Sequence, residues 1–108
     1  MGRKSKMTIR KEIKKDLYDQ LERNGTFGRF FEDLIEDYMR LWDTKNALLE
    51  DIEARGVSVI YDNGGGQRGV KKNDSVDQVI RVNAQMLKIL DNLEIKPAAG
   101  EMSDDDEL

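Results

Sequence analysis

The chain has 108 residues, which predicts one domain, and 18 basic and 22 acidic side chains give it a net charge of -4. It contains no cysteine and no histidine, which excludes disulfides, thiolate nucleophiles, the usual zinc ligands and histidine-based acid–base catalysis. The apolar share is 38% against 37% charged, which favours an elongated or oligomeric protein. No apolar run is long enough for a membrane span or a secretory signal, so we expect a soluble cytoplasmic protein without membrane contact.

The charge is unevenly distributed along the chain. Residues 1–15 carry a net +6, residues 16–56 a net -6, residues 57–72 a net +2 and residues 73–96 a net -1. Residues 97–108 contain five acids and no base. We expect residues 1–6 to form a disordered basic arm and residues 97–108 a disordered acidic tail, because neither offers enough apolar surface to bury.

A first helix is predicted from Met7 onward. Its apolar residues recur every four positions, at Ile9, Ile13, Leu17 and Leu21. Gly25 is expected to end this helix in the left-handed conformation, and Thr26 to cap the next one.

The second predicted helix is long and carries the strongest apolar pattern in the chain. Residues with helical spacing are Phe27, Phe30, Phe31, Leu34, Ile35, Tyr38, Leu41, Trp42, Leu48, Leu49 and Ile52, and Arg55 and Gly56 mark the end. About 28 residues at about 1.5 Å each give a rod of roughly 42 Å. The apolar stripe is wide enough for two neighbours, for which we expect the first helix and a second copy of the chain.

A β-hairpin and a third helix are predicted to follow. Residues 57–61 alternate as a strand, residues 62–66 form a turn, and residues 67–71 return as the partner strand. Ser75 and Gln78 form a capping box for a helix that ends before Pro97. Its apolar face contains Val76, Val79, Ile80, Met86, Leu87, Leu90 and Leu93, and Asn83 within this face is expected to fix the register or the partner.

Two possible ligand motifs are better explained structurally. Gly64, Gly66 and Gly69 match a dinucleotide-binding pattern, but the following helix begins too late to hold a pyrophosphate and too few residues remain for a parallel sheet. The acids at 32–33 and 36–37 could face a divalent cation, but no further carboxylate is fixed nearby by the local sequence. We therefore interpret these features as a hairpin tip and a solvated helix face, and we expect no metal and no cofactor.

The basic head is the best candidate for a functional surface. Arg10, Lys11, Lys14 and Lys15 are predicted to lie on the face of the first helix opposite its apolar residues, where they can meet a phosphate backbone. The alternative is a solubilising surface. A second, weaker basic group is formed by Arg68, Lys71 and Lys72 beside the glycine-rich tip.

A combination of segments covers most of the chain: residues 31–38, 41–42, 56–67, 72–75 and 83–90, followed by the acidic tail. Over residues 27–108 this combination resembles the small subunits of tailed-phage and prophage terminases. The resemblance implies a non-enzymatic component that assembles into a ring, engages double-stranded viral DNA and delivers it to a separate large subunit with the ATPase and nuclease. The implied location is the cytoplasm of the bacterial host.

These considerations give a mainly α fold with a helical hairpin, a short β-hairpin and a third helix, assembled into a ring, with residues 7–96 as the oligomerisation and DNA-binding domain. DNA contact is assigned to Arg3, Lys4, Lys6, Arg10, Lys11, Lys14, Lys15, Arg68, Lys71 and Lys72. Oligomer contact is assigned to Phe30, Ile35, Trp42, Leu49, Asn83, Met86 and Leu90. Large-subunit contact is assigned to Asp104, Asp105, Asp106 and Glu107.

Two other classes of protein remain open from the sequence. One is a small dimeric DNA-binding regulator, in which the basic arm and residues 7–10 act at an operator. The other is a structural coiled-coil adaptor without a nucleic-acid partner. The number of subunits separates a ring from a dimer, and salt-dependent DNA binding separates both from the adaptor.

Overall fold

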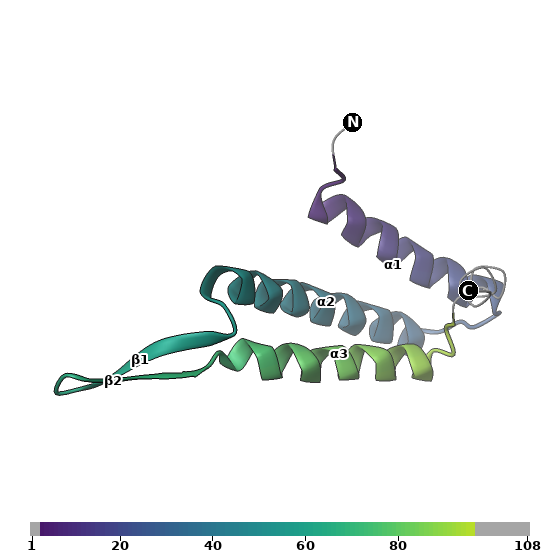
Figure 1. Ribbon diagram of the computed structural model, residues 1–108. Helices are drawn as coiled ribbons and strands as arrows, with labels where there is room; N and C mark the ends of the chain where they lie inside the picture. The colour runs from purple at the N-terminus through teal and green to yellow at the C-terminus, as the bar shows by residue number, and fades with distance from the viewer. Residues whose placement is uncertain (1–2, 97–108) are drawn as a thin grey trace, which may run out of the picture. The chain divides into compact units, whose positions relative to one another are not determined.

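The computed structural model describes residues 3–96, and Figure 1 shows the helices and strands in this part of the chain. Helix α1 spans Lys6–Arg23, α2 spans Arg29–Arg55 and α3 spans Asp74–Asn92. Strands β1 (Ser58–Gly64) and β2 (Gln67–Lys72) lie between α2 and α3. The predicted mainly helical architecture with one β-hairpin is confirmed, while the acidic tail lies outside the described residues.

The chain divides into two compact units. Within the described residues, the first unit comprises residues 3–37 and 88–96, with α1, the start of α2 and the last turn of α3. The second unit comprises residues 38–87, with the rest of α2, the β-hairpin and most of α3.

Both ends of α1 are closed by local hydrogen bonds. The backbone N–H of Thr8 donates to Ser5 Oγ at 3.1 Å, so Ser5 is the N-cap and the helix begins one residue before the predicted Met7. At the other end Gly25 has φ 70°, and the N–H of Thr26 donates to the carbonyl of Leu21 at 2.9 Å. This left-handed glycine ends the helix as predicted.

The start of α2 differs from the prediction. The N–H groups of Phe31 and Glu32 donate to the carbonyl of Gly28, and the helix begins at Arg29. Thr26 does not cap α2, because its own N–H closes α1 and residues 26–28 are used as a connection. Phe27 therefore precedes the helix, and its side chain is 74% exposed.

The buried apolar side chains define a different face of α2 from the one predicted. Ile35 and Met39, four residues apart, are fully buried, whereas Phe30 is 68% exposed because five residues place it on another side of the helix from Ile35. The prediction that Phe27 belongs to the helix is wrong, whereas Phe30, which was assigned to contact between copies, lies in the helix and is exposed on the protomer. In the first unit the other buried apolar residues are Leu17, Leu21 and Leu93, and in the second unit Met86.

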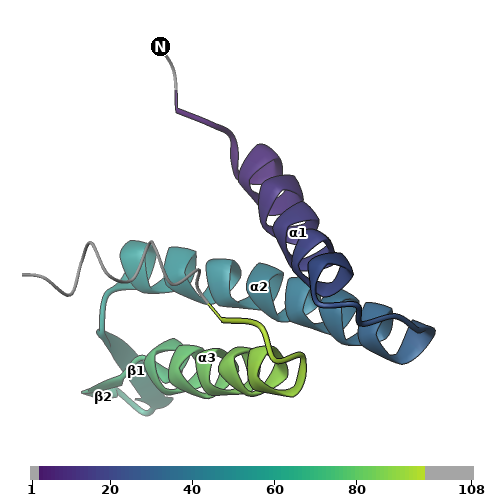
Figure 2. The same cartoon turned by 90° about the vertical axis from the view of Figure 1, so that its right-hand side faces the viewer.

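In the second unit α2 and α3 run side by side in opposite directions. Lys45 Nζ donates to Asn83 Oδ1 at 3.1 Å, and Ser75 Oγ donates to Asp51 Oδ2 at 2.7 Å, so later residues of α2 meet earlier residues of α3. Figures 1 and 2 show this pairing from two directions. The second neighbour of the long helix is therefore α3 of the same chain, where the sequence predicted another copy.

The β-hairpin has a two-residue glycine turn. β1 and β2 pair antiparallel, with Ile60 opposite Val70, and the register shifts between Asp62 and Gly64. Gly65 and Gly66 have φ angles of 61° and 84°, which matches the left-handed conformation that such turns need. These glycines therefore form the predicted hairpin tip.

Candidate nucleic-acid interface

The cations assigned to the basic head do not all lie on one face of α1. Five of the seven are exposed: Arg3, Lys4, Lys6, Lys11 and Lys15. Arg10 and Lys14 are only half-exposed. Lys14 precedes the buried Leu17 by three residues and Leu21 by seven, and Arg10 precedes Leu17 by seven, so both cations share the buried side of the helix. The prediction that these two residues point away from the apolar face is wrong.

Lys14 is directed to a carboxylate at the start of α2. Lys14 Nζ lies 3.0 Å from Glu36 Oε2, and Tyr18 Oη donates to the same oxygen at 3.0 Å. The hydrogen bond from Lys14 lowers the pKa of Glu36 below its ordinary value, with Tyr18 and the charge of Arg10 acting in the same direction. Burial, followed by the hydrogen bond to Glu36, raises the pKa of Tyr18 to about 12. These contacts join α1 to α2 within the first unit.

The Tyr18 contact predicts a specific loss of stability at alkaline pH. The ordinary pKa of tyrosine is about 10, and the folded-state pKa is about 12, so the stabilising contribution is complete below pH 10 and is lost as pH rises toward 12. Tyr18→Phe should lower the free energy of unfolding by about 0.5–1.5 kcal/mol at neutral pH and make its decline between pH 10 and 12 shallower. Urea unfolding of both proteins at several pH values tests this. An equally steep decline in Tyr18→Phe would contradict the assignment.

Lys11 and Lys15 form the outward basic face of α1. They are four residues apart and therefore lie on the same side of the helix. Lys15 Nζ lies 2.8 Å from Asp19 Oδ2, and Lys4 Nζ lies 2.7 Å from Glu12 Oε2, but all four side chains are exposed by more than two fifths. Such exposed pairs contribute about 0–1 kcal/mol each, so a phosphate can compete with the carboxylates for these lysines.

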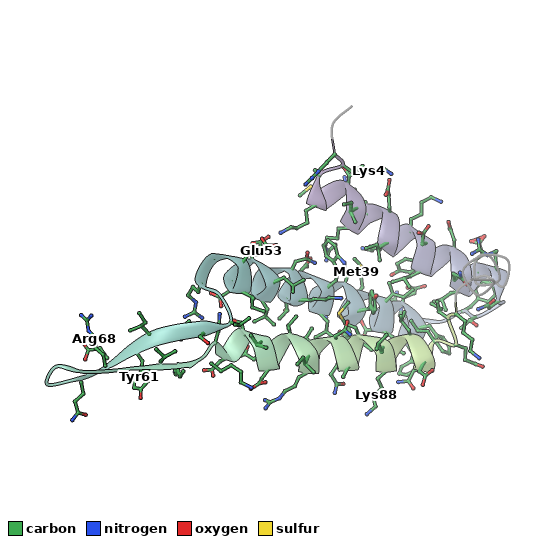
Figure 3. All side chains as sticks on the ribbon, viewed as in Figure 1. Lys4, Met39, Glu53, Tyr61, Arg68 and Lys88 are labelled. Carbon is green, nitrogen blue, oxygen red and sulfur yellow. The ribbon has the colours of Figure 1, made fainter. Side chains whose placement is uncertain are left out.

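The cations of the hairpin are divided between its two faces. In the register of the two strands, Arg68 lies opposite Asp62, Lys72 opposite Ser58 and Lys71 opposite Val59. Side chains alternate between the two faces of a strand, so Lys71 points to the other face from Lys72. Arg68 and Lys72 therefore share a face with Ile60 and Val70, and Lys71 lies on the other. Arg68 Nε is 3.9 Å from Asp62 Oδ2, and Lys72 Nζ is 3.0 Å from Asp77 Oδ1. Figure 3 shows Arg68 on the hairpin. The second basic group does not form one continuous patch.

The residues assigned to contact between copies differ in how far the protomer buries their side chains. Ile35 and Met86 are buried inside the protomer, at 0% and 3% exposure, and Asn83 accepts the hydrogen bond from Lys45 of the same chain. Within the protomer these side chains are buried or hydrogen-bonded, and their assignment to contact between copies stays a prediction. Phe30 and Leu49 are exposed, and Trp42 and Leu90 are half-exposed.

The structure contains a polar cluster that the sequence did not predict. Asp51 accepts hydrogen bonds from Arg55 Nε at 2.7 Å, Arg55 Nη2 at 2.8 Å, Ser75 Oγ at 2.7 Å and Asn73 Nδ2 at 3.1 Å. These hydrogen bonds hold the pKa of Asp51 well below its ordinary range. The bond from Arg55 contributes most, followed by those from Ser75 and Asn73. The cluster joins the end of α2 to the start of α3 at the base of the hairpin.

Asn73 is the centre of this cluster and the N-cap of α3. Its side chain accepts from the N–H of Ser75 at 3.0 Å and donates to the carbonyl of Gly56 at 2.9 Å, and its own N–H donates to the carbonyl of Val57 at 2.8 Å. Ser75 is not the cap, because its hydroxyl is directed to Asp51. The signal in the sequence was an asparagine directly before the helix.

Two further features concern metal-ligating side chains and membrane-spanning helices in the described part of the chain. Within residues 3–96 no group of three or more potential metal ligands gathers. Glu36, one of the acids considered for a cation, interacts with Lys14 and Tyr18. None of the described helices is long and apolar enough to cross a membrane.

Comparison with known proteins identifies the family. The family model described as the phage terminase small subunit matches residues 11–102. No curated protein and no solved structure matches the chain. The match includes all of α2, the β-hairpin and α3, together with most of α1. The chain therefore belongs to the family of phage terminase small subunits.

Proposed function

We propose that this protein is a non-catalytic, oligomeric component that binds double-stranded viral DNA and presents it to the large terminase subunit during genome packaging in the host cytoplasm. Membership of the family supports the general role. The observation that carries the DNA-binding part is the outward basic face of α1, where Lys11 and Lys15 lie one turn apart beyond the basic residues Arg3 and Lys4.

The chemistry of this face favours binding to the phosphate backbone. Lysines act as flexible point charges, and phosphate contacts release counterions without reading base sequence. Arg10 and Lys14 are less suitable, because both share the buried side of α1 and Lys14 is paired with Glu36. Within the α1 basic head we therefore assign the principal DNA contacts to Lys11 and Lys15, with Arg3, Lys4 and Lys6 as further contacts. Arg68, Lys71 and Lys72 remain a secondary proposal.

Charge reversal tests this assignment. Lys11→Glu combined with Lys15→Glu is expected to weaken the affinity for duplex DNA at least tenfold at moderate salt, because two attractive contacts per protomer become repulsive. Fluorescence anisotropy with a labelled duplex measures the change. Lys88→Glu is the matched control, since it reverses an exposed lysine of α3 (Figure 3) and should leave the affinity within about twofold. Unchanged affinity in the double variant would refute the assignment.

We further propose that several copies assemble into a ring through exposed apolar residues. Support comes from large apolar side chains that the protomer leaves exposed: Phe30, Leu49, Ile80 and Leu87. Trp42 and Leu90 are half-exposed and can extend such contacts. Repetition around a ring would multiply weak phosphate contacts.

The acidic tail is proposed to contact the large subunit through Asp104, Asp105, Asp106 and Glu107, which lie outside the described residues. Deletion of residues 101–108 removes all five acids of the tail. It should weaken stimulation of the large-subunit ATPase while the oligomer and its DNA affinity persist. A steady-state ATPase assay with both subunits measures this effect. Full stimulation by the truncated chain would refute the proposal.

A further inference from the structure

We propose that the N-terminal arm of one copy docks on an aromatic and acidic surface of the next copy. This surface, called the Phe27–Phe30 surface below, consists of Phe27, Phe30, Glu22, Glu32 and Asp33, all in the first unit. The proposed function requires an oligomer, and this contact would join its copies. The inference rests on the proposed function only in requiring that several copies assemble.

The Phe27–Phe30 surface is unusual for an isolated protomer. Phe27 and Phe30 are 74% and 68% exposed, and the ring of Phe30 lies against Phe31 edge-to-face at 5.3 Å between centroids. Two open hollows adjoin these rings, with volumes of about 190 and 430 Å³. Tyr18 and Glu32 line both of them. Neighbouring aromatic rings beside such hollows provide a surface that a partner can cover.

The charge of this surface selects the chemistry of the partner. The two hollows are lined by five acids, Asp19, Glu22, Glu32, Asp33 and Glu36, and by one base, Arg29. Lys15 and Lys14 already pair with Asp19 and Glu36, whereas Glu22, Glu32 and Asp33 remain exposed to solvent. A cationic segment can therefore gain both charge pairing and cation–π contact with the phenylalanine rings.

The beginning of the same chain has this complementary chemistry. Arg3 and Lys4 are exposed cations, and Met7 in the first turn of α1 is 67% exposed. In this arrangement Arg3 and Lys4 contact the next copy in place of DNA, whose principal contacts remain Lys11 and Lys15. Methionine sulfur makes favourable contacts with aromatic rings, and lysine and arginine suit a surface with acids at its edge. Residues 1–15 together carry the largest positive charge of any segment of the protein, a net +6.

Chain geometry requires that this contact be made between copies. Met7 is fixed in the first turn of α1, and Tyr18 is eleven residues further along the helix, about 17 Å away. Arg3 can lie at most about 10 Å from Lys6, and Glu22 lies about 24 Å beyond Lys6. The arm therefore cannot reach the Phe27–Phe30 surface of its own chain. A contact between two different surfaces of neighbouring copies is heterologous. Such a contact is repeated from one copy to the next until the copies close into a ring.

Two variants separate the two sides of the contact. The surface variant carries Phe30→Ser with Glu32→Lys, and the arm variant carries Arg3→Glu, Lys4→Glu and Met7→Ser. All five residues are exposed, so both variants should fold, which far-UV circular dichroism verifies. The control is Glu53→Lys, a reversal of an exposed acid on α2 in the other unit (Figure 3).

Light scattering provides the decisive comparison. The wild type and Glu53→Lys should form the same large oligomer. Each of the two variants alone, in dilute solution, should have the mass of one protomer, 12.4 kDa, because the apolar contacts that remain are too weak to hold copies together without the arm. Mixing the surface variant with the arm variant should give a species of twice that mass and nothing larger, because only one intact arm and one intact surface can meet. Wild-type mass in either variant, or a mixture that stays monomeric, would overturn the inference. Neither result would affect DNA binding by Lys11 and Lys15, which the anisotropy experiment tests separately.

Discussion

Asn73→Ala is expected to lower the free energy of unfolding by about 2–4 kcal/mol. The side chain is completely buried, and its loss removes the N-cap of α3, leaves the carbonyl of Gly56 without the Asn73 donor and takes one hydrogen bond from Arg55, which keeps its contacts with Asp51. A loss of this size corresponds to a fall in Tm on the order of 10–20 °C for a chain of this length. Thermal and urea unfolding monitored by circular dichroism measure both quantities.

Two further substitutions identify the origin of this effect. Asn92→Ala changes an exposed asparagine at the other end of the same helix, so it should leave stability within about 0.5 kcal/mol. Asn73→Asp keeps an acceptor for the N–H of Ser75 but removes the amide donor to Asp51 and adds a second negative charge beside it. It should therefore be destabilised despite the retained cap. Stability of Asn73→Ala equal to that of Asn92→Ala would contradict the role of the cluster.

Ile35→Ala is expected to cost about 2–5 kcal/mol, because Ile35 is completely buried and the substitution leaves a cavity. Ile60→Ala is the matched control, since the same change at a position that is 74% exposed and has no assigned contact with another copy should cost at most about 1 kcal/mol. The loss at Ile35 should also be the same at low and high protein concentration, as determined by urea unfolding. A loss that grows as the protein is diluted would place Ile35 between copies, as the sequence had suggested.

The regular elements were predictable because their signals are local. The four-residue spacing of Leu17 and Leu21 and the left-handed Gly25 define α1 and its end, and two glycines between alternating segments define the hairpin. Helix starts were less predictable, because several suitable caps stand within three residues. The hydroxyl of Ser75 is taken by Asp51, which is 24 residues away in the sequence, and Asn73 caps the helix in its place.

The candidate interface was predictable in composition but only partly in geometry. The positive charge of the first fifteen residues is evident from the sequence, and Lys11 and Lys15 lie on the outer face as expected. Lys14 does not, because it follows the spacing of the two buried leucines and meets Glu36. Phe27 was also misplaced, since a helical pattern alone does not show where α2 begins.

The salt dependence of DNA affinity tests the central claim most directly, that the outward face of α1 binds the phosphate backbone. Affinity for a duplex is measured between low and moderate salt for the wild type and for Lys11→Ala with Lys15→Ala. The slope of log affinity against log salt should be steep for the wild type and should fall by about 0.9 for each phosphate contact removed, or about 2 for each bound protomer in the double variant. Parallel slopes for the two proteins would show that these lysines do not meet phosphates and would contradict the account.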